Sequence, residues 1–315
     1  MDKKFAFRQL DKLRHCRKLA AYHFIFSGKD QGYSVNKNGH KIKIAAASDA
    51  DLLRAYNSAL GLIKQHKDGQ LKYSSNFSDV IAMLDLARNA VLSVKSLKKV
   101  ICRLAGLGYS EIWLYLEDEF EIPGEPYFGL QRGRYSQHDL HDLAIFADRL
   151  GITLVPAIQT LAHLKNVLKW ENYHNIRDTA DNLYVGKKET YTFIEKELKA
   201  ATAPFLTNKV HIGMDEAYDL GLGKYFFDNH NVDQHKLITQ HANMVFKLCN
   251  KLRLKPMMWS DMWFEIGSPI HMMYDPKANV KDFGIDRKIG QVYWDYYSDD
   301  VNHYVPVIKK HFELS

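Results

Sequence analysis

Residues 209–217 read KVHIGMDEA. The apolar run over residues 209–214 predicts a buried β-strand, because it is too short for a buried helix. Two neighbouring acids, Asp215 and Glu216, follow it at once. Like charges this close repel each other, so a contribution to stability does not explain them. The pair indicates either acid chemistry at the end of a strand or a solvated pair that caps the next helix.

The same order, a short apolar run followed by an amphipathic segment, repeats along the chain after residue 74. Six runs are predicted as strands: residues 80–86, 111–116, 153–158, 209–214, 256–259 and 290–294. Five segments are predicted as helices: residues 92–104, 138–150, 190–201, 235–252 and 301–312. Repeated β-α order implies a parallel sheet. The spacing suits either a barrel or a doubly wound sheet.

The residues at the strand ends favour the barrel. Nearly every predicted strand ends in polar or aromatic side chains: Asp85, Arg88, Glu117, Asp118, Gln159, His163, Asp215, Glu216, Trp259, Asp261, Tyr293 and Asp295. No strand is followed by a G-x-G-x-x-G or P-loop sequence. Functional side chains at many carboxyl-terminal strand ends are typical of the (β/α)8 fold. We therefore predict a (β/α)8-type TIM barrel, an α/β fold, with six of its strands in this chain.

Six strands leave such a barrel open at its first and last strands. Unpaired strand edges are templates for association with another chain. We expect one of three outcomes: a gap in the barrel wall, a partner subunit that fills it, or a small unstable fold. A homo-oligomer that covers the open edge is one form of the second outcome.

The first 74 residues follow a different pattern. Residues 7–24 carry apolar side chains near helical spacing and predict a helix. Two alternating runs flank Asn38-Gly39, which is a strong hairpin signal. Ser48 is placed to cap a helix over residues 48–66. We predict a small α/β domain over residues 1–74 and the catalytic barrel over residues 75–315.

Composition narrows the class of protein. Hydrophobic residues make up 46% of the 315 residues and charged residues 25%, which fits a soluble globular protein. The net charge of +6 comes from short basic clusters spread over the chain, which disfavours nucleic acid as a partner. No apolar run is long enough for a membrane span. Cys16, Cys102 and Cys249 suit neither a zinc site nor disulfides, so we expect a cytoplasmic protein.

The heptapeptide HIGMDEA, residues 211–217, resembles the signature of glycoside hydrolase family 20, the β-N-acetylhexosaminidases. The context is most similar to the hexosaminidase D-like branch, and the resemblance extends over most of the chain. It implies an exo-acting hydrolase that removes terminal N-acetylglucosamine or N-acetylgalactosamine by a retaining mechanism without a cofactor. In this family the 2-acetamido group of the substrate is the nucleophile, as an exception to the two-carboxylate scheme.

The resemblance also implies distinct roles for the acids. Glu216 would protonate the leaving oxygen and later activate water, while Asp215 would hold the acetamido N–H. His163, in the sequence QTLAHL, would support the glutamate, and His211 would support the pair from the start of the motif. Gln159 stands where the family usually has an aspartate, so an Asp–His–Glu relay is not expected. For His163 the structural alternative is a core histidine bonded to the backbone.

Arg88, in MLDLARNAV, resembles the arginine that binds two hydroxyls of the terminal sugar. The planar fork of guanidinium donors suits vicinal hydroxyls. An ion pair with Asp85 is the structural alternative.

Two aromatic segments resemble the walls of the family's sugar site. Trp259 and Asp261 occur in MMWSDMW, and Tyr293, Trp294 and Asp295 occur in VYWDYY. The resemblance implies that the tryptophans pack on the sugar and that the acids bind its hydroxyls. The Tyr293 hydroxyl would donate to the acetamido carbonyl. Ordinary barrel packing is the structural alternative for these aromatic residues.

Other charged groups carry weaker signals. We expect Glu117, Asp118 and Glu119 to form a solvated loop, with a substrate contact at the rim as the alternative. Four histidines form no ligand set with nearby cysteines or carboxylates, so we expect no metal: His138, His141, His230 and His235.

Two further functions stay open beside hydrolysis of an acetamido sugar. A carbohydrate-binding remnant with weak or no activity would fit the open barrel. A barrel glycosidase with a protein nucleophile would need a second carboxylate about 5 Å from the acid.

Overall fold

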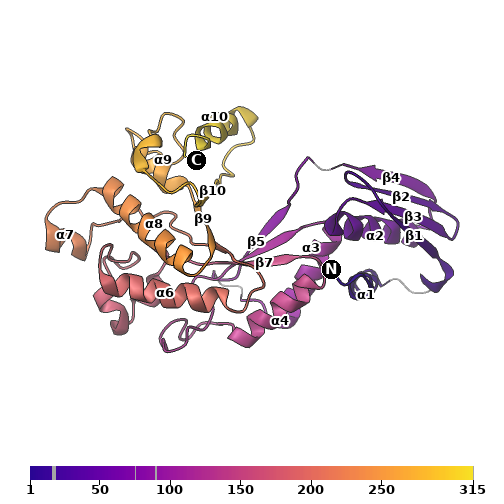
Figure 1. Ribbon diagram of the computed structural model, residues 1–315, viewed down its shortest axis with the longest axis horizontal. Coiled ribbons are helices and arrows are strands. Elements are labelled where there is room, and N and C mark those ends of the chain that lie inside the picture. Colours follow the sequence, from indigo (N-terminus) through magenta and orange to yellow (C-terminus); the bar gives the residue numbers. More distant parts are fainter. Residues whose placement is uncertain (16–18, 75, 89–90, 315) are drawn as a thin grey trace.

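The computed structural model describes residues 1–15, 19–74, 76–88 and 91–314. They form a four-stranded sheet and a six-stranded sheet (Figure 1). Helix α2 (Asp49–Lys64) packs on the four-stranded sheet and contacts helix α3 (Val94–Leu107). Through this helix pair, the two sheets share one hydrophobic core.

The four-stranded sheet has the order β1-β3-β2-β4. Its strands are β1 (His23–Gly28), β2 (Tyr33–Asn38), β3 (Lys41–Ala46) and β4 (Gly69–Tyr73). The predicted hairpin is confirmed, with Asn38 paired to Lys41 and a loop of Gly39 and His40. Gly39 has φ +55°, a conformation that glycine adopts at little cost. The predicted cap is also present, since the Ser48 hydroxyl accepts the Asp51 N–H.

The predicted helix over residues 7–24 is wrong in its second half. Helix α1 (Lys3–Arg14) ends at His15, which has left-handed φ and ψ. After the short 3-10 helix η1 (Leu19–Ala21), the chain enters β1, which pairs in parallel with β3. Aromatic and β-branched residues fit a pleated surface, and this long-range pairing outweighs their helical spacing. Residues 16–18 lie outside the described residues.

The six predicted barrel strands are confirmed. They are β5 (Ile81–Asp85), β6 (Glu111–Tyr115), β7 (Thr153–Ala157), β8 (Lys209–His211), β9 (Lys255–Trp259) and β10 (Gly290–Val292). All neighbouring pairs are parallel, in the order β10-β9-β8-β7-β6-β5. Within the described ranges, no strand pairs with the outer edge of β5 or β10. The sheet is therefore a partial barrel with an open side, as predicted.

The five predicted helices are present as well. Besides α3 they are α4 (Gln137–Asp148), α6 (Lys188–Thr202), α8 (Gln234–Lys251) and α10 (Val301–His311). Shorter helical segments are α5 (Lys165–Leu168), η2 (Glu171–Ile176), α7 (Lys224–Asn229), α9 (Asp261–Gly267) and η3 (Lys281–Phe283). Helices α4 and α8 pack on the sheet, and α6 packs against α8 (Figure 1).

Strand register brings the carboxyl ends of the barrel strands to one edge. Asp85 pairs with Tyr115, Tyr115 with Ala157, Ala157 with His211, and His211 with Met257. Side chains just after these positions therefore face a common space, although they are far apart in sequence. This edge is where the predicted functional residues gather.

Two further expectations concern organisation and charge. Strand β4 ends at Tyr73 and β5 begins at Ile81, on either side of the boundary expected at residue 74. The division into two domains stays a prediction.

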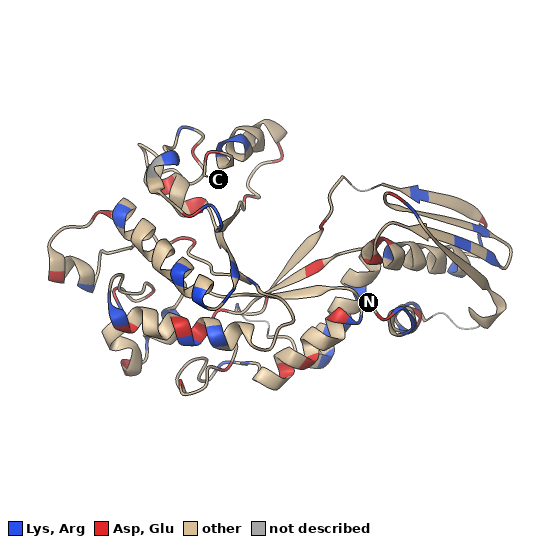
Figure 2. Ribbon diagram, in the orientation of Figure 1, with Lys and Arg blue, Asp and Glu red and all other residues tan. Residues whose placement is uncertain are grey.

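Basic and acidic residues are interspersed over both parts of the chain (Figure 2). Across the described residues, no helix has the length and apolar character needed to cross a membrane.

Candidate active site

The segment after β8 carries the two neighbouring acids in an unusual backbone conformation. Gly213, Met214 and Glu216 have φ of +70°, +74° and +51°. A Cβ atom on Gly213 would lie 2.0 Å from Oε1 of Gln159, so only glycine fits there. Left-handed φ is uncommon for residues other than glycine and clusters at functional sites. The turn brings both acids to the carboxyl edge of the sheet.

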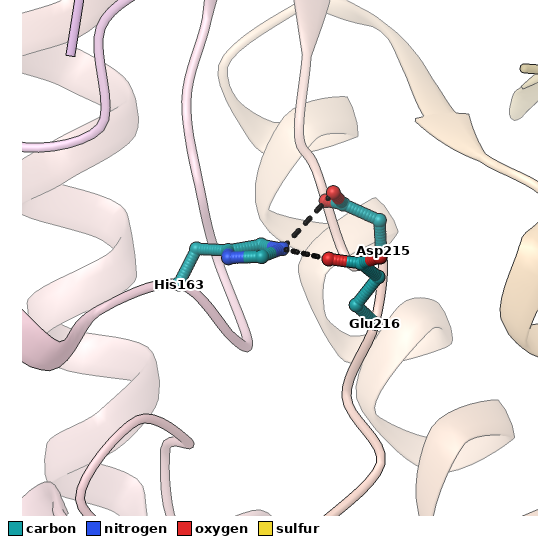
Figure 3. Close-up of side chains that lie close together, drawn as sticks. All are labelled: His163, Asp215 and Glu216. Atoms are coloured by element: carbon teal, nitrogen blue, oxygen red, sulfur yellow. Dashed lines mark ion pairs between the residues drawn. The ribbon is translucent and has the colours of Figure 1, made fainter. Parts of the chain in front are cut away.

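His163 lies opposite the acid pair and contacts both carboxylates (Figure 3). Its Nε2 is 3.1 Å from Oδ2 of Asp215 and 3.4 Å from Oε2 of Glu216. The imidazole comes from the segment that follows β7, and the acids come from the segment that follows β8 (Figure 3). The structure thus brings His163 to both acids, nearer to Asp215 than to Glu216, which the resemblance implied as its partner. Its supporting role stays a prediction.

The charges of Asp215 and His163 support each other. Burial by itself would raise the pKa of Asp215, but the hydrogen bond and charge of His163 outweigh burial and hold that pKa below its ordinary value. Burial would lower the pKa of His163, but Asp215 raises it above the usual range. Asp215 therefore stays ionised at neutral pH, beside an imidazole that readily carries a proton.

Gln159 is a second organiser of Asp215. This fully buried side chain donates to Oδ1 of Asp215 at 2.8 Å and to the Tyr115 hydroxyl at 2.9 Å. Its Oε1 accepts the Met214 N–H at 3.2 Å. A neutral amide can serve donors and acceptors together, whereas a carboxylate here would face Asp215 with a like charge. Sequence reasoning noted Gln159 as a departure from the family pattern but missed this role.

A cavity of about 400 Å³ opens beside the acid pair. Its lining comes from Met83 within β5 and from residues at or after the ends of five strands: Asp85, Arg88, Tyr115, Asp215, Glu216, Trp259, Trp294 and Tyr296. Among these are both acids, the predicted arginine and two predicted tryptophans. Tyr115 and Tyr296 were not predicted, although each lies at a strand end, where a barrel site is expected.

Arg88 forms the ion pair expected as the structural alternative, and its sugar-binding role stays a prediction. Its guanidinium pairs with Asp85 at 3.1 Å and with Glu117 at 3.5 Å, and it also lines the cavity. The Tyr115 hydroxyl donates to Glu117 at 3.0 Å and accepts from Arg88 at 3.3 Å, and the guanidinium lies over the Tyr115 ring. This arrangement aims the arginine while its side chain stays half exposed.

The expectation that Glu117, Asp118 and Glu119 form a solvated loop is wrong. Their exposed fractions are 7%, 1% and 1%. Arg132 pairs with Asp118 at 3.2 Å and with Glu119 at 2.7 Å, and it also donates to the Ala87 carbonyl. Burial raises the pKa of Glu119 to about 7. A long-range guanidinium, invisible in the local sequence, makes this burial possible.

Three predicted sugar ligands do not line the cavity. Asp261 is 1% exposed, and its Oδ2 accepts the Glu216 N–H at 2.9 Å. The Tyr293 hydroxyl donates to Asp295 at 2.9 Å, and His303 contacts the same carboxylate oxygen at 2.8 Å. The sugar-binding roles of Tyr293 and Asp295 stay predictions.

His211 supports the cavity wall. It is fully buried, 5.5 Å from the Trp113 ring and 4.5 Å from the Trp259 ring by centroid distance. Burial lowers its pKa to about 4, so the ring is neutral at physiological pH. Its Nδ1 accepts the Gly213 N–H at 3.2 Å. His211 therefore links the wall tryptophan to the turn that carries the acids.

One group in the described part of the chain has the composition of a metal site. Ligand atoms of His163, Asp215 and Glu216 lie within 4.8 Å of one another. Among the described residues, His138, His141, His230 and His235 belong to no such group. The absence of a metal and of a cofactor stays a prediction.

A parallel β/α barrel sheet with an acid pair, an arginine and aromatic walls at its carboxyl edge is the arrangement expected of a barrel glycoside hydrolase. The family model described as "Glycosyl hydrolase family 20, catalytic domain" matches residues 82–279, well over half of the chain. The chain belongs to this family, as the HIGMDEA signature predicted.

Curated relatives support the assignment. The chain is 23% identical to human "Hexosaminidase D" over 251 residues, which cover 76% of this chain and 49% of the relative. It is 25% identical to "Beta-hexosaminidase" of Vibrio furnissii over 234 residues, 60% of this chain and 38% of that protein. The chain thus spans about half the length of the curated relatives it matches.

Solved structures share the fold. The exo beta-N-acetylglucosaminidase of Vibrio harveyi in complex with N-acetylglucosamine superimposes with a TM-score of 0.69 and 18% identity, over 94% of this chain and 52% of that one. The beta-N-acetylhexosaminidase of Bacteroides fragilis gives 0.71 and 17%, over 95% and 63%.

Proposed function

We propose that the chain is an exo-β-N-acetylhexosaminidase that removes terminal N-acetylglucosamine or N-acetylgalactosamine from glycans or glycoconjugates. The observation that carries the proposal is the contact of His163 with Asp215 and Glu216 at the wall of the cavity. The names of the relatives, which include an exo beta-N-acetylglucosaminidase with bound N-acetylglucosamine, support the same substrate class.

The environments of the two acids suit different steps. Asp215 is buried and kept ionised by His163 and Gln159, so it is ready to accept the acetamido N–H and to stabilise positive charge on that nitrogen. The carbonyl oxygen of the acetamido group then attacks the anomeric carbon, in the substrate-assisted exception among retaining glycosidases. The N–H···carboxylate bond strengthens as charge develops, which is differential binding of the transition state.

Glu216 is the group we assign to the leaving oxygen. Its side chain is 37% exposed and lines the cavity, so it can reach both the leaving group and water. It protonates the glycosidic oxygen as the bond breaks and later removes a proton from the attacking water. Its contact with His163 gives it a partner through which its charge can be balanced in both steps.

The rest of the cavity suits a terminal sugar. Arg88 presents a planar fork of donors for neighbouring hydroxyls. Trp259, Trp294 and Tyr296 present aromatic faces and edges for the apolar side of the ring. A cavity of about 400 Å³ lies within the size range of small-molecule sites.

Hydrolysis of 4-nitrophenyl N-acetyl-β-glucosaminide and of its galactosaminide isomer tests the proposal. We expect turnover with retention of anomeric configuration, which NMR of the first-formed product reports. The matching β-glucoside, which lacks the acetamido group, should not be hydrolysed. Loss of turnover in Glu216→Gln is compared with Glu189→Gln, which changes an exposed acid on α6 and should keep full activity. Equal turnover of the glucoside would refute substrate assistance.

A carbohydrate-binding remnant is the second candidate. The open edges of β5 and β10 favour it, because strands of a closed barrel would flank the cavity there. Calorimetry with a thiazoline-type inhibitor separates the two candidates. Tight binding without turnover indicates the remnant, and tight binding with turnover indicates the enzyme.

We also propose a cytoplasmic location and a second copy of the chain as the partner at the open edge. Cys102 and Cys249 are buried free thiols, which suits a reducing compartment. Analytical ultracentrifugation tests the oligomer; a monomer at all concentrations would contradict it.

A further inference from the structure

Asp261 occupies a position that its sequence context did not reveal. It is the first residue of α9, directly after β9, and its side chain is buried. Its Oδ2 accepts the N–H of Glu216 at 2.9 Å, across 45 residues of sequence. Asp261 does not belong to the cavity lining. The carboxylate therefore faces the backbone of the acid pair and leaves the sugar to other residues.

The acceptor of that N–H matters because of the backbone at Glu216. This residue has φ +51°, and Met214 two positions earlier has φ +74°. Such conformations persist only where surrounding contacts determine them. The Asp261 carboxylate fixes the orientation of the peptide plane at Glu216, and this plane sets the direction in which the Glu216 side chain leaves the backbone.

The two acids are anchored in different ways. The Asp215 carboxylate has two partners, His163 and Gln159. The Glu216 carboxylate has one contact within the described ranges, a 3.4 Å approach to His163. Because the Glu216 carboxylate has few partners, the direction of its side chain depends on the hydrogen bond that holds its backbone N–H.

We propose that Asp261 is a positioning residue for the proton donor: it aims Glu216 at the leaving oxygen through the Glu216 N–H. This inference rests on the proposed function and deepens it. The consequence concerns proton donation alone, because Asp215 and the sugar-binding residues keep their own anchors. Loss of the Asp261 acceptor should lower kcat/KM most for substrates whose leaving group needs a proton.

Leaving-group dependence separates this role from a merely structural one. A phenolate leaving group needs a proton from Glu216, whereas a 3,4-dinitrophenolate departs with little help. In Asp261→Leu, which keeps the branched shape of the side chain but removes the acceptor, kcat/KM for phenyl N-acetyl-β-glucosaminide should fall about 100-fold. For the 3,4-dinitrophenyl substrate it should fall by less than about 5-fold, since positioning of the sugar is intact.

Asp261→Asn is the conservative variant, because the amide oxygen can still accept the Glu216 N–H. It should keep the wild-type ratio of the two kcat/KM values within about 3-fold. The proposal would be overturned if kcat/KM for the 3,4-dinitrophenyl substrate, divided by kcat/KM for the phenyl substrate, rose as much in Asp261→Asn as is expected for Asp261→Leu. This result would decide against the proposal even if Asp261→Leu did not fold. Equal losses on both substrates in Asp261→Leu would also overturn it.

Asp275 supplies a matched control. It is also buried and also accepts a backbone N–H, from Lys277 at 2.8 Å, but it does not contact the acid pair. Asp275→Leu should lower stability without changing the substrate ratio. Failure of the wild-type chain to turn over either substrate would count against the proposed function, whereas an unchanged ratio in Asp261→Leu counts against the positioning role alone.

Discussion

Two runs of neighbouring acids follow strands of the same sheet, and the protein neutralises them differently. The run at Glu117–Glu119 follows β6 and is buried against Arg132 and Arg88. The pair of Asp215 and Glu216 follows β8 and is opposed by His163. Both runs look alike in sequence, as acids after an apolar strand.

The difference lies in the counter-charge. A guanidinium is always protonated, so the counter-charge of the first run does not change with pH. An imidazole gains and loses a proton near neutral pH, so it allows the balance of the second run to change. A site that moves a proton needs the second arrangement, while a site that aims an arginine at a ligand is served by the first. The predictions below test this contrast.

Removal of the proton donor should have the largest effect. In Glu216→Gln, kcat/KM for phenyl N-acetyl-β-glucosaminide should fall about 1,000-fold, since general acid catalysis of this kind contributes 10²- to 10⁴-fold. The free energy of unfolding should change by less than about 0.5 kcal/mol, because the side chain is part-exposed and its one contact is long. Steady-state kinetics and urea denaturation check both. Activity within 10-fold of wild type would remove Glu216 from the mechanism.

Removal of the fixed counter-charge should affect stability most. Arg132→Met leaves Asp118 and Glu119 buried without their shared partner. We expect a loss of about 3 kcal/mol in the free energy of unfolding, as for other buried ion pairs that lose one member. Urea denaturation at neutral pH measures it. If the variant is as stable as wild type, these carboxyls carry no charge in the folded state.

Arg88→Met should show that Arg88, which faces the cavity, contributes to substrate binding more than to stability, unlike Arg132. Its side chain is 51% exposed, so the loss of stability should stay below about 1 kcal/mol. KM for the aryl substrate should rise about 10-fold, since a charge-assisted hydrogen bond to a hydroxyl is lost. A stability loss as large as that of Arg132→Met, with KM unchanged, would assign Arg88 to the structural cluster.

The titratable counter-charge should show itself in the pH dependence of stability. The pKa of His163 is raised in the folded protein, mainly by Asp215 acting against burial. Its stabilising effect is therefore complete below the unfolded pKa of about 6.5 and is lost as pH rises through the higher folded pKa.

His163→Gln tests this effect on the free energy of unfolding, which should be at or below about 1 kcal/mol. It should be the smallest effect among the four variants of this Discussion. The difference in unfolding free energy between wild type and variant should be larger at pH 6 than at pH 8.5. Arg132→Met provides the contrast, because the pKa of Glu119 is about 7 in the wild type and loss of the Arg132 charge raises it further. Its difference from wild type should therefore grow from pH 6 to pH 8.5, in the opposite direction. A constant difference for His163→Gln would mean that His163 does not change charge in this range.

Local pattern was enough to predict several elements. The six barrel strands, the five longer helices, the hairpin at Gly39 and the Ser48 cap all depend on apolar spacing or on a residue's own conformational preference. Parallel strands also align their carboxyl ends, so the gathering of Arg88, Asp215 and Glu216 at one cavity follows from the strand predictions. These features need no knowledge of a distant partner.

Other features were wrong or missed because a distant partner decides them. Strand β1 was predicted as helix, although its pairing with β3 sets its conformation. The burial of Glu119 depends on Arg132, and the position of Asp261 depends on the Glu216 N–H. Tyr296 lines the cavity where Tyr293 and Asp295 were expected, because side chains past a strand end follow the turn of the loop.

The sequence by itself determined the alternation of strands and helices, the acid pair at the end of β8 and the family to which the chain belongs. Only the tertiary structure decided several partners of the charged groups: Asp215 as the nearer acid to His163, Gln159 as a donor to Asp215, and Asp261 as the acceptor of the Glu216 N–H. The physical reason is distance along the chain. Strand and helix propensities act between near neighbours, whereas the state of a buried charge depends on whichever residue the fold brings within about 3 Å of it.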